Sequence, residues 1–142
     1  MISSNAHILY VDDDKDSSEL IKFMLHHAYG NYNVTTVPTP DEALALISQK
    51  GFDLYIVDYR FTNMTGVELC RQIRKTDEQT PILFFTGMAR PADRDCAIAA
   101  GANAYLIKPN DLERLPETVN QMLDGQLAIA HSETPTYAYS DT

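Results

Sequence analysis

The sequence predicts an α/β domain built on a parallel β-sheet with helices on both faces. Five short segments are rich in apolar and β-branched residues, which is the composition of strands buried on both sides. The segments between them repeat apolar residues at helical spacing. Strands that alternate with helices form parallel sheets covered by those helices. The predicted strands are residues 7–11, 32–37, 54–57, 82–85 and 104–107.

Local signals place the first three helices between these strands. Thr39 and Thr65 each stand three residues before a glutamate, which is the capping-box pattern of a helix start. These two helices are expected to end near Gly51 and Lys75. An earlier helix is expected to end at Gly30, and its apolar positions are Leu20, Ile21, Met24, Leu25 and Ala28.

The last two helices are marked by prolines. One is expected to run from Pro91 to about residue 100, with Gly101 at its C-terminal exit. Pro116 lacks an amide donor and disfavours helical geometry at Leu115. We therefore expect a tight turn over residues 111–114 and a regular helix only from about Pro116.

The composition fits one globular domain that does not bind its partners by bulk positive charge. The chain has 142 residues, with 11 basic and 20 acidic side chains and a formal net charge of −9. This acidity argues against binding of DNA or an anionic membrane through charge alone. No apolar segment approaches the ~20 residues of a membrane span, and the N-terminus lacks the pattern of a signal peptide. We therefore expect a cytoplasmic protein.

Residues 1–124 are expected to form the domain. Residues 125–142 contain no basic residue and lose the apolar periodicity, so we expect a flexible C-terminal tail. The two cysteines, Cys70 and Cys96, are expected to be buried thiols, because a chain of this size does not need disulfides.

Polar side chains follow four of the five predicted strands. They are Asp12 and Asp13, Asp58, Thr86 and Lys108. The carboxyl ends of parallel strands meet at one edge of the sheet, where such folds carry their functional sites. Clustered carboxylates repel one another, and Mg²⁺ relieves that repulsion through oxygen ligands. An aspartate at this edge can accept a phosphoryl group, with lysine and threonine side chains available to hold its oxygens.

Each of these residues also has a simpler interpretation. The acidic run that ends at Asp14 can be a solvated loop, and Asp14 itself can cap the following helix. Asp58 and Thr86 can simply end their strands. The functional interpretation is favoured because all the groups follow strands that end at the same edge. The four histidines show no metal-ligand spacing.

Four motifs in this order resemble the receiver domains of two-component response regulators. They are Val11-Asp12-Asp13, Asp58 with Gly66 eight residues later, Phe85-Thr86-Gly87 and Tyr105-Leu106-Ile107-Lys108-Pro109. The resemblance covers roughly residues 6–123 and is to the stand-alone, chemotaxis-regulator-like type. It implies a single doubly wound, flavodoxin-like domain with strand order 2-1-3-4-5.

The resemblance also implies chemical roles. Asp58 matches the phospho-accepting aspartate, and Lys108 matches the lysine of the same site. Asp12 and Asp13 match the acidic pair that holds Mg²⁺, with Asp13 the more direct ligand. Arg60 stands at the position that lends its backbone carbonyl to the metal. These residues together imply Mg²⁺-dependent acceptance of a phosphoryl group on Asp58.

The implied protein is a signalling switch that catalyses only its own phosphorylation and dephosphorylation. Thr86 and Tyr105 match the pair that responds to the phosphoryl group and shifts a protein-interaction face. The implied partners are a sensor histidine kinase or histidine phosphotransfer protein and a downstream effector, without direct contact to nucleic acid or membrane. Homodimerisation on phosphorylation is a further option. The Lys108–Pro109 peptide bond is expected to be cis, as in receivers generally.

The sequence departs from the family pattern at several positions. Thr62 stands where proline is usual, and Thr65 where an acidic or small residue is commoner. In receivers, the positions of Arg60 and Met88 flank the path of the water that hydrolyses the phosphoryl group. Met88 has no strong donor or acceptor to orient that water, and Arg60 is long enough to crowd its approach. Although the charge of Arg60 can instead assist hydrolysis, we expect a long-lived phosphoryl group on Asp58.

Three other functions remain open. Phosphatases of the haloacid-dehalogenase type also use an aspartyl nucleophile and Mg²⁺, but they place it after the first strand in a D-x-D-x-T pattern. Here that segment reads Asp12-Asp13-Asp14-Lys15, without the threonine. An interaction domain that works without phosphorylation is the second alternative. A flavodoxin-like cofactor site is disfavoured, because no Ser/Thr/Gly-rich phosphate loop follows the first strand.

Overall fold

A computed structural model describes residues 6–28 and 32–125 of the chain. Within them, strands and helices alternate as the sequence predicts. The elements are β1 (His7–Val11), α1 (Lys15–His26), β2 (Asn33–Val37), α2 (Pro40–Gln49), β3 (Leu54–Val57), α3 (Gly66–Arg74), β4 (Ile82–Thr86), α4 (Pro91–Ala99), β5 (Ala104–Ile107), a 3₁₀ turn (Leu112–Arg114) and α5 (Leu115–Leu123). No helix in these two ranges is both long and apolar enough to cross a bilayer.

The five strands form one parallel sheet in the order β2-β1-β3-β4-β5. This confirms the doubly wound fold and its strand order. Val11, the last residue of β1, pairs with the last residues of both neighbours, Val37 of β2 and Val57 of β3. The carboxyl ends of these three strands are therefore level, and β4 and β5 extend two residues further at the same edge of the sheet. The strand order reverses direction between β1 and β3. In parallel sheets of this kind the functional crevice lies at the carboxyl ends of the two strands where the order reverses, which here are β1 and β3.

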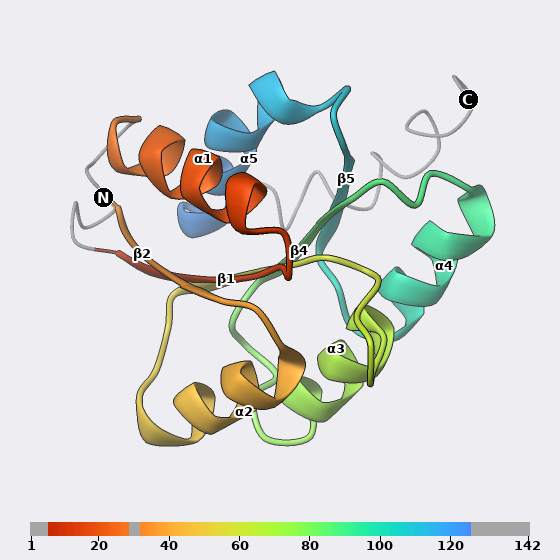
Figure 1. Cartoon of the computed structure of the whole chain (residues 1–142). Helices are drawn as coiled ribbons and strands as arrows, with labels where there is room; N and C mark the ends of the chain where they lie inside the picture. Colours follow the sequence, from red (N-terminus) through yellow and green to blue (C-terminus); the bar gives the residue numbers. More distant parts are fainter. Residues whose placement is uncertain (1–5, 29–31, 126–142) are drawn as a thin grey trace.

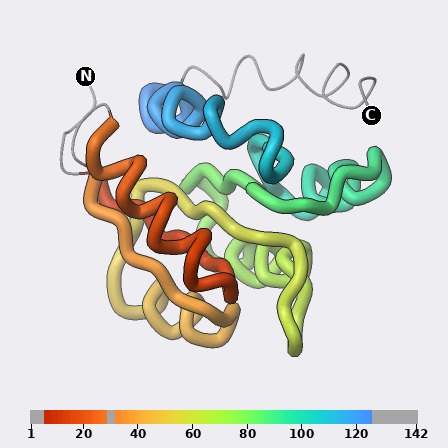
Figure 2. Tube along the Cα trace, turned by 45° about the horizontal axis from the view of Figure 1, so that its top comes forward, coloured from red at the N-terminus to blue at the C-terminus, as the bar shows by residue number. Residues whose placement is uncertain are grey.

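Helices cover both faces of the sheet. Figure 1 shows α1 and α5 on one face and α2, α3 and α4 on the other, and Figure 2 turns α1 and α5 toward the viewer. Side chains alternate along each strand, so β1 sends Ile8 and Tyr10 toward α1 and α5, and Leu9 and Val11 toward the opposite layer. Two buried apolar clusters, one on each face, hold the three layers together.

The predicted helix starts are confirmed by their capping bonds. Thr39 Oγ1 accepts from the amide of Glu42 at 3.2 Å, and Thr65 Oγ1 accepts from the amide of Glu68 at 3.0 Å. Asp14 caps α1 by accepting from the amide of residue 16 at 3.1 Å. The proline at position 116 occupies the first turn of α5, after the short 3₁₀ turn. A proline there removes only an amide that has no partner within the helix.

One expectation about burial is wrong, and one apolar helix position lies at the surface. Leu20, an apolar position of the first helix, is 46% exposed, because α1 turns Ile21 and Leu25 toward the sheet. Cys96 is exposed, whereas Cys70 is buried as expected. The helix α4 packs on the sheet through alanines, and Cys96 lies beside that stripe rather than in it. The predicted helix exit at Gly30, and the predicted tail beyond residue 125, lie outside the described residues.

Arg74 joins several loops at the end of the sheet opposite to the strand ends that carry the polar residues. We call its hydrogen bonds the arginine clamp. The Arg74 guanidinium donates to the carbonyls of Gly101, Asp77 and Thr80 and to Asn103 Oδ1, over 2.8–3.1 Å. Gly101 has a φ of +117°, and a Cβ built there would lie 2.7 Å from Arg74 Cγ. Only glycine fits this backbone and this contact.

Candidate functional site

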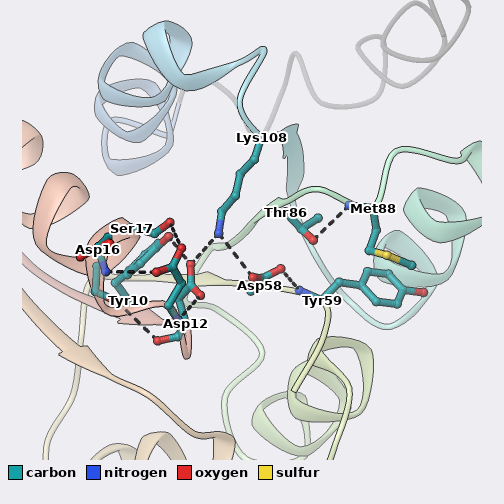
Figure 3. Close-up of polar contacts among 11 residues, drawn as sticks. Tyr10, Asp12, Asp16, Ser17, Asp58, Tyr59, Thr86, Met88 and Lys108 are labelled. Atoms are coloured by element: carbon teal, nitrogen blue, oxygen red, sulfur yellow. Dashed lines mark hydrogen bonds and ion pairs between the residues drawn. The ribbon is translucent and has the colours of Figure 1, made fainter. Parts of the chain in front are cut away.

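The carboxyl ends of β1, β3 and β5 lie at one edge of the sheet and bring three charged side chains together. Lys108 Nζ lies 2.6 Å from Asp12 Oδ2 and 3.4 Å from Asp58 Oδ2. Figure 3 shows the lysine reaching down between the two carboxylates. The Asp12 side chain is fully buried, and those of Asp58 and Lys108 are only 17% and 20% exposed. An ion pair shielded in this way is stronger than one on the open surface.

The ammonium of Lys108 stays charged in this setting. Burial by itself disfavours the charged form, but the hydrogen bonds and negative charges of Asp12 and Asp58 outweigh it and raise the pKa of Lys108. The ammonium also lies 5.5 Å from the centre of the Phe85 ring, whose face attracts a cation. A fixed positive charge next to Asp58 can neutralise the oxygens of a group transferred to that carboxylate.

The Asp12 carboxylate is almost fully used by the protein. Its Oδ2 accepts from the hydroxyl of Tyr10 at 2.7 Å as well as from Lys108, and its Oδ1 accepts from the amide of Asp14 at 2.9 Å. A carboxylate offers about four lone-pair positions, so roughly one remains for a further ligand. Strand alternation places Tyr10 and Asp12 on the same side of β1, which is the signal by which the sequence points to this contact.

The position of Asp58 depends on the turn that follows it. Its Oδ1 accepts from the amide of Tyr59 at 2.6 Å, and its own amide donates to the Val11 carbonyl at 3.1 Å. The turn closes through the amide of Gly66, which donates to the Tyr59 carbonyl at 2.7 Å. A Cβ at position 66 would lie 2.0 Å from the Asp58 carbonyl oxygen. This close approach explains why a glycine stands eight residues after Asp58.

The carboxylates fit an oxygen-liganded cation of the Mg²⁺ type. Asp13 is exposed and makes no hydrogen bond or ion pair with any described residue, so its oxygens are free to bind a ligand. Within residues 6–28 and 32–125, no three acidic, histidine or cysteine side chains form a ready-made metal cage. Mg²⁺ does not need one, because it keeps several waters and takes one or two carboxylates. Asp13 and Asp58 would hold it, with Arg60 at the position whose carbonyl was predicted as a ligand.

Thr86 and Tyr105 are joined through the backbone of Met88. The amide of Met88 donates to Thr86 Oγ1 at 3.3 Å, and the hydroxyl of Tyr105 donates to the Met88 carbonyl at 2.7 Å. Thr86 is 1% and Tyr105 7% exposed. The Tyr105 ring stacks on Phe84, with centroids 5.7 Å apart and planes 14° apart. The tyrosine thus lies inward against the sheet, and the Lys108–Pro109 bond is cis, as predicted.

Comparison with known proteins identifies the family. The family model described as the response regulator receiver domain matches residues 8–120. The chain is 36% identical over 123 residues to the transcriptional regulatory protein ZraR of Salmonella typhimurium, covering 87% of this chain and 27% of that protein. It is 31% identical over 134 residues to the response regulator MprA of Mycobacterium leprae, covering 94% of this chain and 58% of that protein. The chain therefore spans between about a quarter and somewhat over half of the length of these relatives.

Solved structures of similar chains share the whole domain. The chemotaxis response regulator CheY4 of Vibrio cholerae is 31% identical and superposes with a TM-score of 0.76, covering 82% of this chain and 98% of that one. A CheY-like receiver domain protein from Methanospirillum hungatei, also 31% identical, has a TM-score of 0.79 and covers 86% of this chain and 96% of that one. With the family model matching most of the sequence, the chain belongs to the response regulator receiver domains of two-component systems.

Proposed function

We propose that this domain accepts a phosphoryl group on Asp58, with Mg²⁺, from a sensor histidine kinase or a histidine phosphotransfer protein. The observation that carries the proposal is the Lys108 ammonium held between Asp12 and Asp58 at the carboxyl ends of the strands. Asp58 is a partly exposed carboxylate next to a fixed cation, which is the environment that an aspartyl nucleophile needs.

The proposed transfer is a direct displacement at phosphorus. An oxygen of Asp58 forms a bond to the phosphorus atom of the donor phosphohistidine, and the phosphorus–nitrogen bond of the donor breaks. The imidazole nitrogen keeps the electron pair of that bond, and Asp58 becomes an acyl phosphate. Lys108 is close enough to move from the carboxylates to the phosphoryl oxygens. Bound Mg²⁺ supplies further positive charge at the same oxygens.

The phosphoryl group would then act on the hydrogen-bonded path from Thr86 to Tyr105. Thr86 Oγ1 holds the Met88 amide, and the Met88 carbonyl holds the Tyr105 hydroxyl. When the Thr86 hydroxyl turns to a phosphoryl oxygen, the backbone at Met88 loses one anchor, and the loop between β4 and α4 is free to shift. The shift changes the populations of two arrangements of the α4–β5–α5 face. A downstream effector protein would read that face.

Labelling by a small phosphodonor tests this function. Incubation with acetyl phosphate and Mg²⁺ is expected to add one phosphoryl group per chain, and Asp58→Asn is expected to abolish it. Asp53→Asn is a matched control, because Asp53 precedes the same strand at its other end and, among the described residues, its side chain accepts only from the His7 amide. Labelling that persists in Asp58→Asn would contradict the proposal. Continuous turnover of an aryl phosphate would favour a phosphatase, and absence of labelling would favour an interaction domain that works without phosphorylation.

A further inference from the structure

Tyr10 places a hydroxyl in a largely apolar layer, directly beneath the site. It belongs to the buried cluster between the sheet and α1 and α5, together with Ile8 and Ile21, and its exposed fraction is 0%. A hydroxyl in such surroundings is costly unless it is hydrogen-bonded. Its bond is to Asp12 Oδ2, at 2.7 Å. Burial and the charge of Asp12 raise the pKa of Tyr10, so the hydroxyl remains a donor at neutral pH.

The bond from Tyr10 competes with other uses of Asp12. Tyr10 and Lys108 together occupy both lone-pair positions of Asp12 Oδ2, and the Asp14 amide occupies one of Oδ1. In contrast, the neighbouring Asp13 carboxylate is exposed. The two members of the acidic pair are thus in different situations. Asp12 is held by the protein, and Asp13 is open to a ligand.

We propose that Tyr10 is a positioning residue of the metal site, which holds part of the Asp12 carboxylate within the protein and thereby weakens the binding of Mg²⁺ by the acidic pair. This inference rests on the proposed Mg²⁺-dependent function. A hydrogen bond to a carboxylate draws negative charge toward its donor and away from other cations. Tyr10 therefore lowers the attraction that Asp12 can exert on a metal held mainly by Asp13.

The direction of the change in Mg²⁺ affinity follows from the bonds to Asp12 that remain when the Tyr10 hydroxyl is removed. In Tyr10→Phe the ring still fills its place, and Asp12 is still oriented by Lys108 and by the Asp14 amide. Orientation is therefore kept, while Oδ2 regains a lone pair and charge that no water can reach. Removal of a group that orients a metal ligand typically costs about 10–100-fold in affinity. Here the orientation is kept, so the released charge decides the sign, and we take the same range as the scale of the opposite change. Lys108 balances part of the Asp12 charge that the hydroxyl no longer balances. We therefore expect the lower end of this range, a dissociation constant for Mg²⁺ about tenfold smaller than that of the wild type.

Isothermal titration of the full chain with MgCl₂ tests the inference. Tyr10→Phe is expected to bind Mg²⁺ about tenfold more tightly than the wild type. Tyr55→Phe is the matched control, since Tyr55 is a buried tyrosine bonded to Asp77 at 3.1 Å, toward the opposite end of the sheet, and its loss is expected to leave the affinity unchanged. In an Asp12→Asn background, Tyr10→Phe is expected to lose most of its effect, because the charge that the hydroxyl balances is gone.

The outcomes separate this inference from the proposed function. If the wild type binds Mg²⁺ and Tyr10→Phe binds it equally or less tightly, Tyr10 does not restrain Asp12 and the inference is wrong by itself. If the wild type does not bind Mg²⁺ at all, both the inference and the metal-dependent function are contradicted. If Tyr10→Phe fails to fold, the hydroxyl is required for the stability of the fold, and this result also overturns the inference.

Discussion

Replacing Gly66 by alanine disturbs Asp58 without changing any charged group of the site. The new Cβ would lie 2.0 Å from the Asp58 carbonyl oxygen and 3.0 Å from Phe84 Cε2. The carbonyl has to retreat by more than about 1 Å to reach an ordinary contact distance. Overpacking costs about 1–3 kcal/mol, and a backbone oxygen cannot rotate away as a side chain can. The higher helix propensity of alanine offsets part of this cost. We therefore expect the free energy of unfolding to fall by about 2 kcal/mol.

The same displacement moves the phosphoacceptor, so the effect on chemistry is larger than the effect on stability. A shift of about 1 Å at a reacting group costs roughly 100-fold in rate. We expect the labelling of Asp58 by acetyl phosphate, followed by intact mass at saturating Mg²⁺, to slow by about that factor. Urea unfolding in chelator measures the stability. Gly51→Ala is the control, because a Cβ there meets no atom within 4 Å. Wild-type stability and labelling in Gly66→Ala would refute the close-approach argument.

Three further perturbations follow from the same structure. Saturating Mg²⁺ is expected to raise the free energy of unfolding by about 2.7 kcal/mol at a hundredfold excess over its dissociation constant. Asp13→Asn is expected to shrink that gain while raising stability in chelator, and equal melting temperatures in Mg²⁺ and chelator would count against a metal site. Arg74→Ala breaks the clamp at the far end of the sheet and is expected to cost about 3 kcal/mol in urea unfolding. Its labelling rate is expected to stay unchanged, and a slower rate in the folded variant would show that the clamp reaches the site. Arg60→Asn combined with Met88→Glu is expected to speed loss of the phosphoryl group about 10–100-fold by admitting and orienting water. Slower loss would show that Arg60 assists hydrolysis.

Much of the fold follows from local patterns in the sequence. The capping-box patterns at Thr39 and Thr65 place two helix starts to the residue, because each threonine accepts from an amide that the helix leaves unpaired. Pro116 marks the start of the last helix for a similar reason. The polar residues after the strands converge because parallel strands have their carboxyl ends at the same edge of the sheet, which brings Asp58 and Lys108 together from positions 50 residues apart.

The features that the sequence does not predict depend on distances between helices and strands. Lys108 lies nearer to Asp12 than to Asp58, and this difference is set by tertiary structure that no local pattern records. Leu20 belongs to the apolar repeat of the first helix but is exposed, because α1 turns Ile21, about 100° further round the helix, toward the sheet. The contact between Gly66 and the Asp58 carbonyl is likewise a tertiary one, for which the sequence offers only the spacing.

The chemical nature of the product at position 58 tests the central claim most directly. An acyl phosphate on an aspartate is reduced by borohydride to homoserine, whereas phosphate esters of serine or threonine and free carboxylates are not. The chain is to be incubated with acetyl phosphate and Mg²⁺, reduced, digested and analysed by tandem mass spectrometry. The account predicts homoserine in place of Asp58, dependent on Mg²⁺, with Asp12 and Asp13 unchanged. Homoserine at another aspartate, or a phosphoryl group that resists reduction, would contradict it.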